Sequence, residues 1–277
     1  MLLRPFVRLA SLALGMSLLA GCGPASALLH APDTLPCLRR DCRIRYEPGA
    51  RAYAEAVEKI LPNAMAQVEA LQERPFGDKF VVVAYAEEGA YAAANGRGSA
   101  MPSGVAFMDR VSLSPRLWRD APKQLVPYLT HELSHAHLLS RLSSFAMVRI
   151  PPWFTEGLAV LASDGGGAQR VGAAEARQAI RAGLTIETPE STGALGAFSL
   201  PFVKNFPADD PRRQAHMAYR QAGMFVAFLR DRDRRAFTAL LDGLFAGKSF
   251  AAAFHEAYDA SPAALWTDFA KSLDDQG

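Results

Sequence analysis

Two histidines four residues apart, with a glutamate beside the first, form the pattern of clearest chemical meaning in this chain. Residues 131–135 read His-Glu-Leu-Ser-His. In an α-helix, side chains four positions apart differ by about 40° in direction and about 6 Å in height, so His131 and His135 can reach one metal ion. Glu132 is turned about 100° from His131, where its carboxylate can contact a water held at an open metal position. The pattern is typical of metal-assisted hydrolysis.

The residues around this motif predict a buried helix. Apolar side chains precede the motif within residues 125–130 and follow it at Leu138, Leu139 and Leu142, on faces that the histidines do not use. Pro127 is expected near the first turn of this helix, because a proline further inside would lose a backbone hydrogen bond and clash with the preceding turn.

A catalytic zinc site needs a third protein ligand, because such sites use three side chains and leave the fourth position to water. Residues 151–159 predict a second apolar helix, and its only early carboxylate is Glu156. A buried carboxylate without a partner is costly, and a metal ion is its natural partner here. We therefore expect His131, His135 and Glu156 to bind one Zn²⁺ ion.

Together the two motifs resemble those of the gluzincin metallopeptidases, in which an HExxH helix is followed by a second helix that supplies a glutamate ligand. Glu156 follows His135 by 21 positions, close to the spacing in aminopeptidase-N-like and thermolysin-like enzymes. The resemblance is closest to small bacterial peptidase MA-like lipoproteins and covers residues 46–277 in layout. It implies an α+β, zincin-like domain, with a small N-terminal sheet, the active-site helix and a mainly helical C-terminal part.

A tyrosine further along the chain matches a third element of this resemblance. Gluzincins of the aminopeptidase-N type carry a tyrosine that opens a helix well beyond the ligand glutamate, and Tyr219 occupies that place. The resemblance implies that its hydroxyl stabilises the oxyanion formed when water attacks a carbonyl. The residue types alone leave another interpretation open, which is a half-buried aromatic at a helix start.

The reaction that the resemblance implies is hydrolysis of a peptide bond in a peptide or protein substrate. Zinc would bind and acidify a water molecule, and Glu132 would accept its proton and later deliver it to the leaving amine. The strand before the active-site helix, predicted within residues 110–113, would lie at the edge of the cleft and pair with substrate backbone.

Two features of the family are missing from the chain. Val160 stands where thermolysin-like enzymes place an aspartate that orients a metal-binding histidine, so the sequence does not identify that histidine's partner. Residues 107–110 match the amine-binding segment of aminopeptidases poorly, and Met108-Asp109 is predicted to be a turn between two strands. The sequence therefore does not favour aminopeptidase specificity.

The N-terminal residues predict export and attachment to a membrane through lipid. Arg4 and Arg8 precede an uncharged apolar run, residues 9–19, that is short for a membrane span. The run ends in Leu-Ala-Gly-Cys, a bacterial lipobox, so residues 1–21 are predicted to be a lipoprotein signal peptide and Cys22 the lipidated residue. The glycine that follows favours the outer membrane, facing the periplasm. The alternative is an ordinary signal peptide with an unmodified cysteine.

The other two cysteines agree with export. Cys37 and Cys42 are expected to form a small disulfide loop in an oxidising compartment, with free thiols as the alternative. Residues 22–36 are small, aperiodic and contain proline, so they are predicted to be a tether. Residues 37–277 are long enough for one domain with a substantial core.

The charge distribution excludes one class of partner. The formal net charge of +2 comes from Arg4 and Arg8, so the chain after the predicted signal peptide is balanced. No basic stripe remains for binding nucleic acid.

Apolar periodicity predicts the remaining elements. We expect a helix over residues 52–71, kinked or split at Pro62, and strands over 79–85 and within 104–113. Further helices are predicted near residues 173–182, 214–230, 235–246, 250–258 and 262–273. The three glycines 165–167 are predicted to form a flexible loop, and residues 183–213 a long loop that borders the cleft.

Two other interpretations of the chain stay open. It could be a non-catalytic envelope lipoprotein that uses a metallopeptidase-like fold for binding or assembly, although Glu132 would then have no use. The histidines could also be core residues that bind no metal. His137, on another face of the helix than His135, is expected to be packed or exposed and not a ligand.

Overall fold

The computed structural model describes residues 23–77, 80–191 and 210–273, which fall into two compact units. Unit 1 comprises the described residues of 23–59 and 80–123, and unit 2 those of 60–77, 124–191 and 210–273. The predicted signal peptide and Cys22 lie outside the described residues. Within the described ranges, no helix is both long and apolar enough to cross a membrane.

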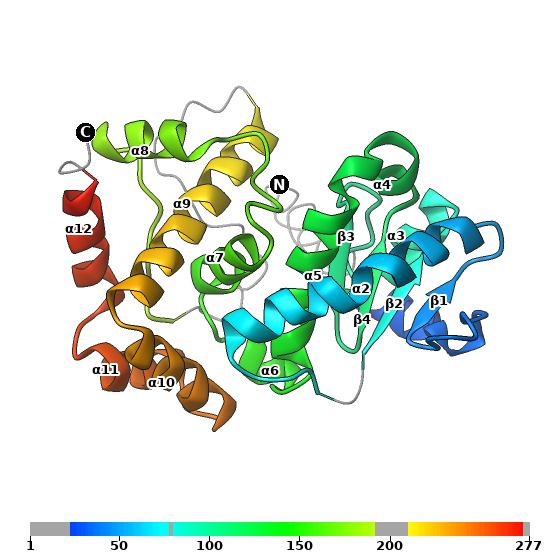
Figure 1. The fold of residues 1–277 in the computed structure, drawn as a ribbon, viewed down its shortest axis with the longest axis horizontal. Coiled ribbons are helices and arrows are strands. Elements are labelled where there is room, and N and C mark those ends of the chain that lie inside the picture. The colour runs from blue at the N-terminus through cyan, green and yellow to red at the C-terminus, as the bar shows by residue number, and fades with distance from the viewer. Residues whose placement is uncertain (1–22, 78–79, 192–209, 274–277) are drawn as a thin grey trace, which may run out of the picture. The chain divides into compact units, whose positions relative to one another are not determined.

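Unit 1 is built on a mixed four-stranded sheet with the order β1-β2-β4-β3 (Figure 1). Strands β1 (Ile44–Tyr46), β2 (Val81–Ala84) and β4 (Arg110–Leu113) are parallel, and β3 (Gly104–Phe107) pairs antiparallel with β4. All four residues of β2 are apolar, as expected for a strand that lies inside the sheet and is covered on both faces. Strand β4 has β2 on one side and β3 on the other, so it has no free edge for substrate backbone, and the prediction that residues 110–113 pair with substrate is wrong. The outer strands are β1 and β3.

A two-residue turn joins β3 to β4, as predicted for Met108-Asp109. Phe107 pairs with Arg110 across the ladder, and Met108 adopts a φ of 54°. Positive φ angles are usual in two-residue hairpin turns, because their twist matches that of the flanking strands. The second strand region predicted from the sequence is therefore a hairpin, and its two strands complete the sheet.

The segment predicted to be a tether is packed onto unit 1 where the structure describes it. Residues 23–29 are helical, and a 3-10 turn, η1 (Pro32–Thr34), follows. The Arg110 side chain is only 4% exposed, and its Nη1 donates hydrogen bonds to the carbonyl oxygens of Ala27, at 3.1 Å, and His30, at 3.0 Å. A buried guanidinium needs acceptors, and carbonyls at the end of a short helix provide them.

The predicted disulfide is confirmed. Cys37 is bonded to Cys42, and their Cα atoms are 4.9 Å apart. The bond closes the loop before β1, and the backbone of Cys37 bridges to Arg45 in that strand. Two short helices, α3 (Glu88–Ala94) and α4 (Pro115–Asp120), complete unit 1.

Helix α2 (Arg51–Gln72) is unbroken, so Pro62 does not split it. Pro62 itself is exposed. Buried apolar side chains recur along one face of the helix, at Tyr53, Val57, Leu61, Ala64 and Val68. Burial of this face stabilises the helix enough to offset the hydrogen bond lost at the proline.

Unit 2 is helical throughout its described elements. It contains the C-terminal part of α2, followed by α5 (Leu125–Leu139), α6 (Ser144–Met147) and α7 (Pro152–Ala162). The 3-10 turn η2 (Pro122–Gln124) leads into α5. The later helices, close to the predicted ranges, are α8 (Ala173–Arg181), α9 (Pro211–Arg232), α10 (Arg234–Phe245), α11 (Phe250–Tyr258) and α12 (Pro262–Ser272). Leucine and aromatic side chains form the core of this unit, the aromatics including Trp153, Phe154, Phe225, Phe237 and Phe254.

The two units together make the described chain a mixed α and β protein, with most strands early and most helices late. This agrees with the predicted α+β class. Part of the long loop predicted over 183–213 is described and anchored, since Trp153 Nε1 donates to the carbonyl of Pro189 at 3.0 Å. Residues 192–209 of that loop lie outside the described residues.

Candidate metal centre

Helices α5 and α7 carry the residues that the sequence singled out. Helix α5 begins at Leu125, so Pro127 lies in its first turn, as predicted. His131 and His135 follow one helical turn apart. Helix α7 begins with Pro152 at its first position, where a proline's missing N–H costs nothing, and it carries Glu156 one turn later.

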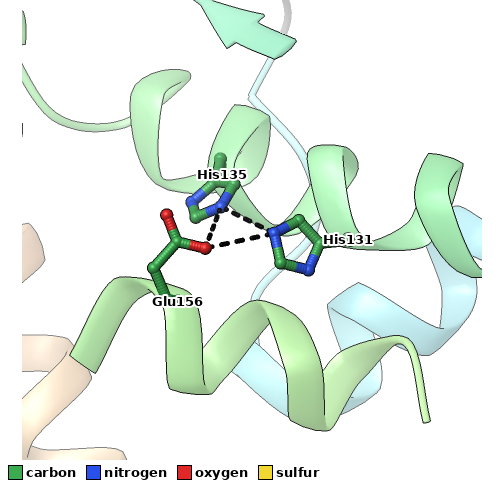
Figure 2. A group of neighbouring side chains, drawn as sticks. All are labelled: His131, His135 and Glu156. Carbon is green, nitrogen blue, oxygen red and sulfur yellow. Dashed lines mark hydrogen bonds and ion pairs between the residues drawn. The ribbon is translucent and has the colours of Figure 1, made fainter. Parts of the chain in front are cut away.

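The two imidazoles and the carboxylate converge on one point (Figure 2). The Nε2 atoms of His131 and His135 are 3.2 Å apart, and Glu156 Oε2 lies 3.2 Å from the first and 3.5 Å from the second. Ligands arranged tetrahedrally around an ion with bonds of about 2.0–2.1 Å are about 3.3 Å apart. The triangle therefore has the dimensions of one face of a coordination tetrahedron, and the three residues could hold a metal ion.

The protonation of His131 explains why a cation belongs between these atoms. His131 Nδ1 lies 2.9 Å from the carbonyl oxygen of Gly166. A carbonyl only accepts, so Nδ1 carries the proton, and Nε2 of neutral His131 presents a lone pair to Glu156. Glu156 Oε2 is buried and makes no hydrogen bond of good geometry within the described chain. Facing lone pairs repel one another unless a proton or a metal ion lies between them.

The pKa values of the metal-free cluster shift in the direction that this repulsion requires. Burial is the largest single influence and lowers the pKa of His131, but the combined effects of Glu156, Glu132 and the Gly166 carbonyl raise that pKa above its ordinary value. Burial raises the pKa of Glu156, yet the charges of His135 and His131 hold it well below its usual range. The cluster therefore favours positive charge among its three ligand atoms.

The ligand side chains of the centre are largely buried. The side chains of His131, His135 and Glu156 are 6%, 13% and 16% exposed. This burial withdraws the ligands from most of the water, and Glu156 Oε2 itself is buried. Among the described residues, no fourth potential ligand is grouped with these three, whereas a structural metal site is closed by a fourth side chain.

The structure also brings Glu132 and Tyr219 to this centre. Glu132 is buried at 8% exposure, and its charge contributes to the raised pKa of His131, so its carboxylate lies within electrostatic range. The Tyr219 ring, from α9, lies against the His131 ring with centroids 6.2 Å apart and planes 29° apart. All five residues predicted to form the site are thus grouped in unit 2.

Helix α9 reaches the centre because it packs closely on α7 (Figure 1). Val160 lies against Gly223 of α9, where a Cβ atom would come within 2.5 Å of Val160 Cγ1. Val160, at the position where thermolysin-like enzymes have an orienting aspartate, is therefore a packing residue between helices. It does not orient a histidine.

Sequence reasoning missed the partner of His131. Residues 165–167 were expected to be a flexible loop, but they are buried, and the carbonyl of the middle glycine accepts the Nδ1–H of His131. The available signal was the run of three glycines directly after the ligand helix. Without a Cβ atom, a backbone can approach an imidazole closely.

The other histidines do not join the centre. His137 is buried, and its Nε2 donates to the carbonyl of Arg74 at 2.9 Å, so of the two predicted alternatives, packed or exposed, it is packed. His216 is half-buried, and its Nδ1 accepts the backbone N–H of Arg170 at 3.3 Å. His30 and His255 are exposed.

Comparison with known proteins adds no assignment. No family model, curated protein or solved structure matches this chain. The function is therefore argued from the residues and geometry of the centre itself.

Proposed function

We propose that this protein is a zinc-dependent metallopeptidase of the gluzincin type that hydrolyses peptide bonds in the bacterial cell envelope. The observation that carries the proposal is the triangle of His131 Nε2, His135 Nε2 and Glu156 Oε2, with edges of 3.2, 3.2 and 3.5 Å. Glu132 follows the first of these ligands directly in the sequence. A ligand set with an adjacent carboxylate is suited to hydrolysis.

The donor atoms support zinc as the ion. Two imidazole nitrogens and one carboxylate oxygen are the protein ligands of several catalytic zinc sites, whereas magnesium and calcium sites are built from oxygen. Three protein ligands leave a fourth position for water or substrate. Bound there, zinc would supply Lewis-acid chemistry and make a water molecule more acidic.

The side chains of the protein would perform the remaining steps. Glu132 accepts a proton from the attacking water and transfers it to the nitrogen of the leaving amine as the peptide bond breaks. Tyr219 donates a hydrogen bond to the oxyanion that forms on the carbonyl. The contact between the Tyr219 and His131 rings supports this role, because it keeps the tyrosine beside the centre.

The proposed location is the periplasmic face of the outer membrane, with a lipid on Cys22. The signal-peptide pattern and lipobox of the sequence support this location. The disulfide between Cys37 and Cys42 supports it independently, because such bonds persist in oxidising compartments.

The test is incubation of the full chain, in detergent and with zinc, with a diverse peptide library, followed by mass spectrometry of the products. The control is Glu132→Gln, which keeps the shape of the side chain and all three metal ligands. Cleavage by the parent alone would establish a peptidase, and the cut positions would distinguish exopeptidase from endopeptidase activity. If both proteins bind zinc and neither cleaves, the non-catalytic alternative is favoured. Equal cleavage by both would remove Glu132 from the mechanism.

A further inference from the structure

The glycine turn after α7 is a direct continuation of the helix that carries Glu156. The N–H of Gly165 donates to the carbonyl of Val160 at 2.9 Å, and the hydroxyl of Ser163 donates to the carbonyl of Ala159 at 2.6 Å. These bonds close the end of α7 and fix the direction of the chain that follows. The same continuous segment thus provides the ligand Glu156 and then turns back toward a second ligand, His131.

The turn approaches His131 more closely than any side chain would allow. The carbonyl of Gly166 accepts the Nδ1–H of His131 at 2.9 Å. Gly167 has a φ of +81°, and a Cβ atom there would lie 2.8 Å from His131 Cε1. Both the backbone conformation and the available space therefore require glycine at residue 167.

An arginine from α9 holds the chain just after this turn. Arg220 Nε donates to the carbonyl of Val171 at 2.8 Å, and its Nη2 donates to that of Ala168 at 3.3 Å. The guanidinium occupies the space beside Gly165, where a Cβ atom would come within 2.7 Å of Nη2. Arg220 follows Tyr219 in the sequence, so adjacent residues of α9 contact the turn and the ring of His131.

We propose that the Gly165–Gly167 turn, held by Arg220, is the positioning element of the metal centre. Its carbonyl at Gly166 keeps the proton of His131 on Nδ1 and aims Nε2 at the point shared with the other ligands. A partner of this kind orients a metal-binding imidazole and makes it a stronger ligand. The inference rests on the proposed function, because it assumes that the centre binds a metal ion.

Substitution of Gly167 by alanine tests the close approach. The matched control is Gly183→Ala, because Gly183 has a φ of +78° and a Cβ atom there would meet nothing within 4 Å. Both variants carry the same backbone strain, and only Gly167→Ala pushes against His131. We expect Gly167→Ala to weaken Zn²⁺ binding by about 10–100-fold and the control to bind like the parent, measured by competition with a chromophoric chelator.

Substitution of Arg220 tests the support behind the turn. Arg220→Met removes both hydrogen bonds, and Arg220→Lys keeps the charge and a single donor atom in place of the two nitrogens that donate here. We expect weaker Zn²⁺ binding in the order parent, Lys, Met, together with a change in the visible spectrum of the Co²⁺-loaded protein. The control is Arg230→Met, since Arg230 lies on the same helix and pairs with Asp231 at the surface. Denaturation of each metal-free variant establishes that it folds.

The outcomes separate this inference from the proposed function. If the parent binds no divalent ion, both fall together. If the parent binds Zn²⁺ and both Gly167→Ala and Arg220→Met bind it equally well with unchanged Co²⁺ spectra, the turn does not position His131, and the proposed function still stands. If Gly167→Ala fails to fold, the Arg220 series decides alone.

Discussion

A Cβ atom on Gly157 would lie 2.6 Å from the carbonyl oxygen of Ala222, closer than real side chains come to a backbone atom. The backbones of α7 and α9 therefore pack against each other immediately after Glu156. This contact sets the separation between the helix with the carboxylate ligand and the helix with Tyr219. The glycine of the ligand motif thus has a packing role that is visible only in the folded chain.

Gly157→Ala should destabilise the protein by about 1–3 kcal/mol, because the added methyl group must push α7 and α9 apart. The measurement is denaturant unfolding of the metal-free protein. Gly89→Ala is the control, since Gly89 lies in α3 and a Cβ atom there would meet nothing within 4 Å. A similar effect of both substitutions would show that the close helix contact does not matter.

Tyr219→Phe should lower kcat by about 10²–10³-fold if the hydroxyl stabilises the oxyanion. Zinc affinity should not change, because the phenyl ring still lies against His131. The readout is turnover of a peptide found in the library experiment, beside a zinc titration of each protein. An unchanged kcat would leave Tyr219 with only a packing role.

Removal of the metal should lower the free energy of unfolding, because the ion binds the folded chain, whereas the unfolded chain has no assembled site. At a free zinc concentration about 100 times the dissociation constant, the bound ion contributes about 2.7 kcal/mol. Glu156→Ala should abolish this response of thermal unfolding to zinc and to chelator, whereas Glu256→Ala, at an exposed position of α11, should retain it. A full zinc response in Glu156→Ala would place the third ligand elsewhere.

Stability should fall as pH decreases below about 6.5, in part because of His137. Burial lowers the pKa of His137 below 6.5, although its hydrogen bond to the Arg74 carbonyl opposes this shift. The unfolded chain then binds the proton more tightly than the folded one, so the contribution of His137 is complete above about pH 6.5 and is lost as pH falls through the lower, folded pKa.

His137→Gln removes the titrating group and keeps a donor for the Arg74 carbonyl. Its free energy of unfolding should therefore depend less on pH than that of the parent between about pH 7 and 5. Both proteins are measured without metal, so that the titration of His131 and Glu156 is common to them and cancels in the difference. Parallel pH profiles would contradict the prediction.

Cys22→Ser should move the protein from the membrane to the soluble fraction of the producing bacterium, because serine has no thiol to acylate. The control is the double variant Cys37→Ser and Cys42→Ser, which loses the disulfide but keeps Cys22. Fractionation followed by immunoblotting distinguishes the two. Persistent membrane attachment of Cys22→Ser would exclude lipid anchoring through this residue.

Local patterns predicted the elements of the site well. The spacing of His131 and His135 predicted that both lie on one helical face, and Pro152 with the apolar run after it predicted the helix that carries Glu156. The hairpin at Met108-Asp109 and the Cys37–Cys42 disulfide were also predictable. In each case, interactions between residues close in the sequence determine the conformation, so the relevant information lies within a few positions.

The tertiary structure determined the features that depend on contacts between residues far apart in the sequence. The sequence did not predict the hydrogen bonds from Arg110 to residues 27 and 30, because these acceptors lie far from Arg110 in the chain. The prediction that residues 110–113 pair with substrate backbone failed because the order of strands follows from pairing between distant segments, which no single strand encodes.

The hydrogen-bond partner of His131 is the clearest example of a feature that only the tertiary structure determines. Side-chain types identify the metal ligands. The acceptor of the His131 Nδ1–H, however, is a backbone carbonyl. Every residue has a backbone carbonyl, so side-chain types cannot identify this acceptor. Only the packing of α7 and its glycine turn against α5 determines which of the many carbonyls meets Nδ1. Sequence by itself determined which atoms can bind a metal, and the fold decided how they are aimed, because orientation arises from contacts between elements that are distant in the chain.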